Sequence, residues 1–337
     1  MSKSANVTIV VVPRERFSFA AESLASVVAN TEEPFRIVYV DGGSPALVRD
    51  FLRTEAHQKH FTLIRADRYL SPNQARNLGF AKVETKYTVF LDNDVVVAPG
   101  WLSGLVRCAE ETGASVVGPL YCIGGPYHQN IHMAAGLAHF EERDGKRCFV
   151  DQHLMGHSWL SDVRDRLVRE ESERCEFHCA LARSDTLREI GPLDEQLLGI
   201  VETHADFCMT VREHGGRVWF EPGSIVTYVP PPPVRWSDLP YFLLRWSKEW
   251  TVPGRQRFMK KWGLPEDSTD LTRHDWWRVS QRLRCVHPLW DMLGALGVQR
   301  RNRVAAKLLG AVDFLVTRQI ARRRTFQGSM LPSRASL

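Results

Sequence analysis

The stretch Val89–Val97 reads VFLDNDVVV, an apolar run with three polar residues at its centre. The β-branched and aromatic residues around them are typical of a buried strand. Burying two carboxylates is costly unless a cation or dense hydrogen bonding compensates their charge. Asp92 and Asp94 flank one residue, so in an extended chain both side chains point to the same side. The pair predicts a clamp for a hard divalent cation, Mg²⁺ or Mn²⁺. The alternative is two turn carboxylates that end a strand.

Strand and helix patterns alternate along the chain up to this stretch. Apolar runs typical of buried parallel strands are each followed by helical spacing. This alternation predicts an α/β fold, in which a mostly parallel sheet with right-handed crossovers is flanked by helices. The expected strands are Val7–Val12, Phe35–Val40, Phe61–Ile64 and Tyr87–Leu91, and the expected helices are Phe19–Ala29, Pro45–Ala56 and Asn73–Ala81.

Polar or turn residues follow three of these strands. Pro13 ends the first strand, Asp41 ends the second, and Asp92 to Asp94 end the fourth. In open parallel sheets, ligands bind at the carboxyl ends of the strands, so we expect one crevice there. No G-x-G-x-x-G or Walker A loop occurs, and neither a dinucleotide fold nor a P-loop NTPase is favoured.

The later part of the chain has weaker periodicity. Residues 121–160 predict an antiparallel excursion with a mobile loop over the crevice, and Cys175–Arg183 predicts a strand. Asp206–Gly215 predicts a helix that Asp206 opens. The prolines of Pro230–Pro233 are incompatible with a helix. We therefore place a boundary there, between a sheet domain of residues 1–233 and a helical, aromatic-rich, basic C-terminal extension of residues 234–337.

Composition fits a soluble globular protein, because 44% of the 337 residues are apolar and 25% are charged. The seven cysteines include no Cys-x-x-Cys pair, which favours a reducing cytoplasm over a disulfide frame. Cys175, His178 and Cys179 lie close together, but no second half-site accompanies them, so we expect no metal there. Neither a signal peptide nor a membrane-spanning run is visible, and a cytoplasmic location is expected.

Charge is distributed unevenly. From Pro240 onward there are 19 Lys and Arg against 7 Asp and Glu, a net of +12, while the preceding residues hold 25 against 32, a net of −7. Arg303–Arg324 combines an apolar stripe with basic residues, which predicts an amphipathic basic helix. This helix would attach the protein peripherally to an anionic membrane at its inner face, or pack on its own domain or on a second subunit of a dimer. No nucleic-acid partner is expected.

Several motifs, in order, resemble those of the inverting glycosyltransferases of family 2, which have the GT-A, Rossmann-like fold. Val38–Ser44 resembles the V-D-x-G-S turn of that family, Gln74–Gly79 its A-R-N-x-G helix start, and Leu91–Asp94 its Asp-x-Asp strand. Arg188–Glu195 resembles the segment that precedes the catalytic acids, and Asp206 with Phe207 the helix on the acceptor side.

The resemblance implies an enzyme that moves a sugar from a UDP- or GDP-sugar to a hydroxyl of a glycan, lipid-linked or other acceptor. Asp92 and Asp94 would hold the divalent cation, Mn²⁺ or Mg²⁺, which neutralises the leaving diphosphate. The residues implied to contact the nucleotide-sugar are Pro13, Asp41, Arg76, Asn77, Asp92 and Asn93.

An inverting displacement also needs one base beside the acceptor hydroxyl. Glu202, His204 and Asp206 are the candidates, while His132 and His178 are weaker candidates for acceptor or phosphate contacts. Three positions depart from the family pattern. Gly42 replaces a second Asp, Thr203–His204 replaces an acidic pair, and Tyr228 stands near the place of a metal-binding His. These departures leave open a second hypothesis, a non-catalytic module that binds partners through its basic tail.

Overall fold

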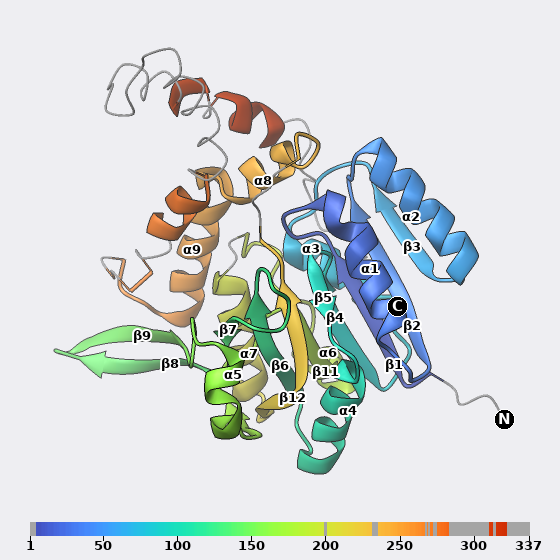
Figure 1. The fold of residues 1–337 in the computed structure, drawn as a ribbon. Helices are drawn as coiled ribbons and strands as arrows, with labels where there is room; N and C mark the ends of the chain where they lie inside the picture. The colour runs from blue at the N-terminus through green and yellow to red at the C-terminus, as the bar shows by residue number, and fades with distance from the viewer. Residues whose placement is uncertain are drawn as a thin grey trace.

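The computed structural model describes residues 5–198, 201–230, 235–266, 268, 270–271, 275–282, 310–312 and 315–321. Among these residues, ten strands form one sheet that helices flank on both sides (Figure 1). The main path of the sheet runs β10-β12-β6-β11-β4-β1-β2-β3, with β5 beside β12 and β7 beside β6. A separate hairpin, β8–β9, projects from the sheet.

The first part of the sheet is parallel, as the alternation predicts. Strand β1 lies between β2 and β4 and pairs with both in parallel register. The side chains of β1 alternate between two cores: Ile9 packs on one face of the sheet and Val10 on the other, and both are fully buried. Burial on both faces explains why the strand sequence is apolar throughout. The elements are β1 (Val7–Val12), α1 (Ala20–Ala29), β2 (Phe35–Gly42), α2 (Ala46–Lys59), β3 (Thr62–Ala66), α3 (Pro72–Phe80) and β4 (Tyr87–Asp92).

Helix α3 approaches the sheet very closely at Gly79. A Cβ atom added there would lie 2.3 Å from Cγ1 of Val10, so only glycine permits this packing. The helix begins with a capping box in which Ser71 and Gln74 satisfy each other's backbone N–H groups. The packing and the cap together fix the direction of the side chains that α3 presents to the carboxyl ends of the strands.

The second part of the sheet introduces an antiparallel strand. Strand β11 (Cys179–Arg183) pairs antiparallel with both β4 and β6 (Val116–Ile123). It is shorter than the predicted Cys175–Arg183, because the hydroxyl of Tyr121 binds the backbone of Glu176 and draws the preceding residues into a turn. That turn lies at the end of β4, where the backbone N–H of Asp92 donates to the carbonyl of His178 at 3.1 Å.

The predicted antiparallel excursion is confirmed. It consists of β7 (Ile131–Met133), β8 (Gly136–Arg143) and β9 (Lys146–His153), and the short helices α5 (Leu160–Val163) and η2 (Arg164–Arg166) follow it. The remaining elements up to the boundary region are β5 (Val95–Val97), α4 (Trp101–Thr112), β10 (Glu170–Ser172), α6 (Ser184–Ile190), α7 (Val201–Glu213) and β12 (Val218–Tyr228).

The expectation that Asp206 opens a helix is wrong. Helix α7 begins at Val201, so Asp206 lies inside it and Glu202 lies in its first turn. Ala205, which precedes Asp206, is buried in a cluster with residues of the β8–β9 hairpin and of the extension. Asp206 therefore has no capping role.

The C-terminal extension packs on the sheet domain through its aromatic residues. Helices α8 (Leu239–Arg245) and α9 (Lys248–Trp262) follow residues 231–234, which lie outside the described residues. Phe258 of α9 is fully buried in a cluster with Phe149 and Leu197, and Tyr241 of α8 packs on Phe17. Burying such large side chains contributes about 1.5–3 kcal/mol each. The extension and the sheet domain therefore share hydrophobic cores.

Of the predicted basic helix Arg303–Arg324, residues 310–312 and 315–321 are described and helical. Ile320 packs against the cluster that contains Phe17 and Tyr241, while Val312 and Leu315 are exposed. The rest of the predicted helix, including Arg322 to Arg324, lies outside the described residues. No helix in the described ranges is both long and apolar enough to cross a membrane.

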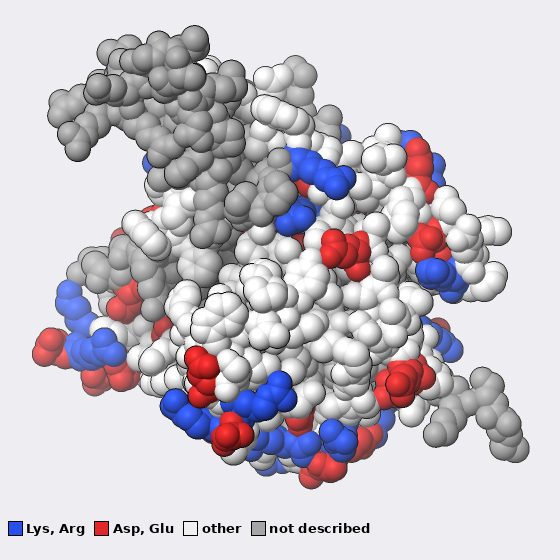
Figure 2. Space-filling model, viewed as in Figure 1, with Lys and Arg blue, Asp and Glu red and all other residues white. Residues whose placement is uncertain are grey.

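Charged side chains gather at the edges of the face drawn in Figure 2. Basic and acidic groups lie side by side along its lower edge, over α4 and α5, while its centre is largely uncharged. Ion pairs at the surface include Lys86–Glu110 and Arg169–Glu111. Exposed ion pairs of this kind contribute little to stability.

Candidate active site

The three predicted strand ends lie next to one another. In the parallel register, Val12 pairs with Asp92, and the residue that follows, Pro13, leads into a loop over the sheet edge. Asp41 lies near the end of the adjacent strand β2. Asn93 braces the loop, because its side chain accepts from the N–H of Arg14 at 3.0 Å and donates to the carbonyl of Arg16 at 3.2 Å.

Asp92 is fully buried and lies among cationic and imidazole groups. Its oxygens are 3.1 Å from Nε of Arg14, 3.2 Å from Nη2 of Arg76 and 3.2 Å from Nδ1 of His178. Burial by itself raises the pKa of Asp92, but the hydrogen bond from His178 and the two guanidinium charges outweigh it, so the pKa lies below its ordinary value. Asp92 is therefore held as a carboxylate without a metal ion.

Asp94 is equally buried but differs in its partners. Neither of its side-chain oxygens has a hydrogen-bond partner, and the nearest cation is Nη1 of Arg14 at 3.8 Å. Burial is the main cause that raises the pKa of Asp94 to about 8, although Arg14 acts in the opposite direction. A buried carboxylate with free oxygens is a donor set suited to a hard divalent cation, which would keep it ionised. Asp94 therefore fits the cation that the sequence predicts.

Arg14 links the aspartate pair to the adjoining cavity. Its guanidinium also lies 3.0 Å from an oxygen of Glu15 and 3.9 Å from the ring centroid of Tyr228. Burial lowers the pKa of Arg14. The surrounding carboxylates and Tyr228 raise it by a larger amount, so the net pKa lies above its ordinary value. Tyr228 donates its hydroxyl to Glu15 at 3.0 Å.

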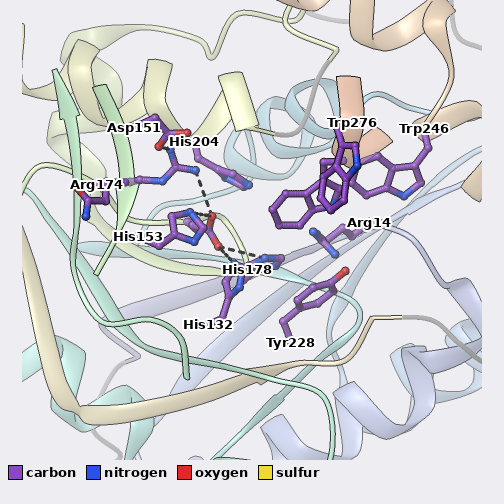
Figure 3. A pocket seen from close by; sticks show the side chains of 13 residues that line it. Arg14, His132, Asp151, His153, Arg174, His178, His204, Tyr228, Trp246 and Trp276 are labelled. Atoms are coloured by element: carbon purple, nitrogen blue, oxygen red, sulfur yellow. Dashed lines mark hydrogen bonds and ion pairs between the residues drawn. The ribbon is translucent and has the colours of Figure 1, made fainter. Parts of the chain in front are cut away.

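A cavity of about 350 Å³ opens beside these groups. Figure 3 shows His132, His153 and His178 gathered on one side of it, with Trp246 and Trp276 facing them. The cavity thus combines ionisable groups from the sheet domain with indole rings from the C-terminal extension. Its lining residues are Arg14, His132, Asp151, Gln152, His153, Arg174, Glu176, His178, His204, Tyr228, Trp246, Trp276 and Trp277.

Glu176 is the carboxylate at the centre of the histidine side. It lies 3.0 Å from Nε2 of His132, 3.2 Å from Nε2 of His153 and 3.3 Å from Nε2 of His178. Burial opposes its charge, but the histidine contacts outweigh this effect and hold the pKa of Glu176 well below its ordinary value. Arg174, which is also paired with Asp151, adds a contact of 3.3 Å.

Among the three base candidates, His204 lines this cavity. Its Nδ1 accepts a hydrogen bond from the backbone N–H of Phe177 at 3.0 Å, and its Nε2 has no partner. Burial lowers the pKa of His204 well below its ordinary value, so the ring is neutral. Because Nδ1 is the acceptor, the single proton of the neutral ring is on Nε2. In this orientation His204 can donate a hydrogen bond into the cavity.

Glu202 and Asp206 are buried on α7 and do not line the cavity. Asp206 is bound to the extension, with Nζ of Lys261 at 2.6 Å and Nε1 of Trp262 at 2.9 Å. Burial raises the pKa of Asp206, and these two contacts oppose the rise. The structure thus ties Asp206 to the docking of α9.

The predicted nucleotide contacts lie around the strand ends and are themselves braced. Asp41 accepts from the backbone N–H of Ser44 at 2.9 Å and pairs with Arg65 at 2.5 Å. Arg76 stacks on a phenyl ring, that of Phe177, at 3.8 Å, in addition to its contact with Asp92. Such bracing fixes the shape of the sheet edge.

Asn77 serves a different segment. Its amide donates to the carbonyl of Leu193 at 2.9 Å and to Glu195 at 3.0 Å, and its oxygen accepts from the N–H of Leu193. It therefore fastens the segment that precedes α7 onto α3. Pro13 is buried, and its carbonyl lies 3.5 Å from the hydroxyl of Tyr241.

Sequence reasoning missed several lining residues, above all Glu176, His153 and Arg174. The signal available in the sequence was the density of histidine and acidic residues between His128 and His178. That density does not say which strands bring the residues together.

Part of the chain matches a known protein family. Residues 8–169 match the model described as glycosyl transferase family 2. Over this stretch the chain is similar to that family. The match includes the aspartate pair and ends before Glu176.

The curated relatives are distant and much longer than this chain. An uncharacterized protein of Sinorhizobium fredii, y4gI, is 23% identical over 219 residues, which are 63% of this chain and 23% of that protein. An uncharacterized glycosyltransferase of Rickettsia bellii is 27% identical over 92 residues, which are 27% of this chain and 13% of that protein. The chain thus spans less than a quarter of the length of either.

Among solved structures, the chain is similar to GalNAc-T7, which was crystallised with UDP, GalNAc and Mn²⁺. The TM-score is 0.51 at 17% identity, and the match covers 83% of this chain and 54% of that one. TarS of S. aureus, residues 1–349, has a TM-score of 0.48 at 14% identity, with 71% and 63% covered. The likeness to GalNAc-T7, together with the sheet, shows the GT-A fold that the sequence predicts.

Proposed function

We propose that this chain is a glycosyltransferase that moves a sugar from a UDP- or GDP-sugar to an acceptor hydroxyl with inversion. The observation that carries the proposal is the buried pair Asp92 and Asp94, which lies at the carboxyl ends of parallel strands in a family 2 segment and adjoins a cavity. Ligands bind at this edge in open α/β sheets.

Transfer requires that negative charge growing on the leaving diphosphate be stabilised. Asp92 and Asp94 would hold a divalent cation, Mn²⁺ or Mg²⁺, which supplies positive charge to the diphosphate. Arg14 has a guanidinium already fixed between the two carboxylates and the cavity, so it adds charge that needs no reorganisation. We assign the nucleotide contacts to the braced residues around this edge, namely Pro13, Asp41, Arg76, Asn77, Asp92 and Asn93.

The acceptor hydroxyl needs a base, and Glu202, His204 and Asp206 remain the candidates from the sequence. His204 is the one that lines the cavity, but its Nε2 carries the proton while Nδ1 accepts from the backbone. We therefore assign His204 first to donating a hydrogen bond to a substrate oxygen. It would act as a base only after its ring turns over and exposes a lone pair.

The indole rings suggest the chemistry of the acceptor. Trp246 is buried and Trp276 is 75% exposed, and both face the ionisable side of the cavity. Flat aromatic faces bind apolar surfaces such as the C–H faces of sugar rings, while their N–H groups reach polar atoms. We therefore propose that the extension binds a glycan or lipid-linked sugar acceptor.

A thermal-shift screen tests the donor half of the proposal. Nucleoside diphosphates and their sugars should raise the melting temperature with Mn²⁺ present and do so much less in EDTA. The size of the shift across UDP, GDP and other bases would identify the nucleotide. A protein that no nucleoside diphosphate stabilises, with or without Mn²⁺, would contradict the proposal.

A further inference from the structure

The histidine side of the cavity contains a compact set of potential metal ligands. Nε2 of His132, a carboxylate oxygen of Glu176 and a ring nitrogen of His178 all lie within 4.8 Å of one another, and all three residues are buried. His153 approaches the other oxygen of Glu176, with Nε2 at 3.2 Å. The four side chains come from β7, from β9 and from the turn before β11.

The two ring nitrogens of His178 contact two different carboxylates. Its Nδ1 lies 3.2 Å from an oxygen of Asp92, a pure acceptor, so Nδ1 carries a proton. Its Nε2 then faces an oxygen of Glu176 at 3.3 Å. It is the same oxygen that Nε2 of His132 approaches at 3.0 Å, so two ring nitrogens converge on one carboxylate oxygen.

The same arrangement is the one that metal sites use around their ligands. A metal-bound histidine commonly donates its second N–H to a carboxylate, which fixes the ring and raises its basicity. Asp92 occupies that place for His178. Arg174 and Asp151 neutralise each other behind Glu176, so the cluster holds one carboxylate charge to offset a divalent ion.

The ligand atoms and their separations fit a transition metal. Zn²⁺ binds histidine nitrogen and carboxylate oxygen at about 2.0–2.2 Å, which places tetrahedral ligands roughly 3.4 Å apart. The separations of 3.0 and 3.3 Å from Glu176 to His132 and His178 are near this value. Imidazole ligands favour Zn²⁺ and its neighbours over Mg²⁺.

We infer that His132, Glu176 and His178, with His153 as a fourth ligand, bind one divalent transition-metal ion of the Zn²⁺ class in the wall of the cavity. This site is separate from the oxygen-only pair Asp92 and Asp94, and it does not rest on the proposed transfer reaction. A metal there would place a Lewis acid beside His204 and the cavity.

Metal binding by the unmodified full chain is the primary test. The protein is stripped with a chelator, transferred to metal-free buffer, and titrated with Zn²⁺ in competition with a chelating dye of known affinity. We expect one Zn²⁺ per chain, and a raised melting temperature on binding. Co²⁺ serves as a visible probe, because four-coordinate Co²⁺ absorbs far more strongly than six-coordinate Co²⁺. A chain that takes no Zn²⁺ from the dye would overturn the inference without the need for any variant.

Variants then locate the site. His132→Ala should weaken Zn²⁺ binding by roughly tenfold or more and reduce the Co²⁺ bands. Asp94→Asn, which removes the free carboxylate of the other site, should leave the Zn²⁺ affinity unchanged. His57→Ala is the matched control, because His57 lies exposed on α2. Melting curves in chelator confirm that each variant is folded.

Two outcomes of these variants contradict the assignment. Native affinity and stoichiometry in His132→Ala would show that Zn²⁺ binds elsewhere. Loss of Zn²⁺ binding in Asp94→Asn but not in His132→Ala would show that Zn²⁺ binds at the aspartate pair. Zn²⁺ binding is measured without nucleotide, so the two tests are independent. Absence of Zn²⁺ binding would not contradict the proposed transferase, and absence of nucleotide binding would not contradict the Zn²⁺ site.

Discussion

Asp94→Asn should make the metal-free protein more stable at high pH. The structure gives the reason, because Asp94 is a fully buried carboxylate whose oxygens have no hydrogen-bond partner. An amide of the same size carries no charge to bury. The variant therefore removes a penalty that the native protein suffers only when Asp94 is ionised.

The magnitude follows from the pKa of Asp94. Burial raises it from an ordinary 3.8 to about 8. The folded protein thus keeps a proton that the unfolded chain releases, so stability falls as pH rises between these two values, at up to ~1.4 kcal/mol per pH unit. Four units correspond to an upper limit of about 6 kcal/mol. The difference between variant and native protein should be near zero at pH 4 and largest above pH 8.

Urea unfolding in EDTA, at intervals from pH 5 to pH 9, measures this difference. Asp67→Asn is the control, since the Asp67 side chain is 97% exposed and should give no pH-dependent gap. Mn²⁺ added at pH 8 should recover stability in the native protein and not in Asp94→Asn. If the native protein and Asp94→Asn lose the same free energy between pH 5 and pH 9, the reasoning about this carboxylate is wrong.

Other experiments test neighbouring parts of the account. His204→Ala should lower kcat by roughly 10²-fold or more. His204→Gln can still donate an N–H and should keep more activity. An equal loss of kcat in both variants would favour the base role for His204. Asp206→Asn should lower the free energy of unfolding by about 1–3 kcal/mol, because it weakens the contacts with α9. Urea unfolding measures this free energy, and an unchanged value would contradict the role of Asp206 in docking α9. Phe258→Ala should cost about 3–5 kcal/mol in the same assay, and a loss below about 1 kcal/mol would mean that α9 is not part of the shared core. Exposed Val312 and Leu315 in a basic tail predict co-sedimentation with anionic liposomes that salt weakens, and absence of binding at low salt would contradict the membrane proposal.

The strand ends could be predicted because the information is local. A parallel strand buried on both faces must be apolar throughout, so the polar residues at Asp41 and at Asp92 to Asp94 mark where each strand stops. Parallel pairing then places these ends at one edge whatever the details of the loops. The same reasoning gave the fold class and the neighbourhood of the aspartate pair.

The histidine cluster could not be predicted because it depends on tertiary register. His132, His153 and Glu176 lie on separate strands and turns, and an antiparallel excursion with weak periodicity gives no register from sequence. The order of the sheet matters as well, since β11 enters antiparallel beside β4 and brings His178 to Asp92. The spacing of residues along the chain predicts neither the register of the excursion nor the order of the strands in the sheet.

The error at Asp206 has a related cause. An acidic residue before an apolar run resembles a helix start, but here the preceding residues are themselves buried and helical. Contacts with Lys261 and Trp262, far away in sequence, use the carboxylate instead. Local propensity yields to tertiary packing at such positions.

Release of nucleoside diphosphate from a panel of nucleotide-sugars, with Mn²⁺ and without acceptor, tests the central claim most directly. The account predicts slow release of one nucleoside diphosphate by the native protein. That release should be abolished by EDTA and strongly reduced in Asp94→Asn, and it should be unchanged in the exposed control Asp67→Asn. Binding of a nucleotide-sugar without any release, or release at the native rate by Asp94→Asn, would contradict a transferase centred on this aspartate pair.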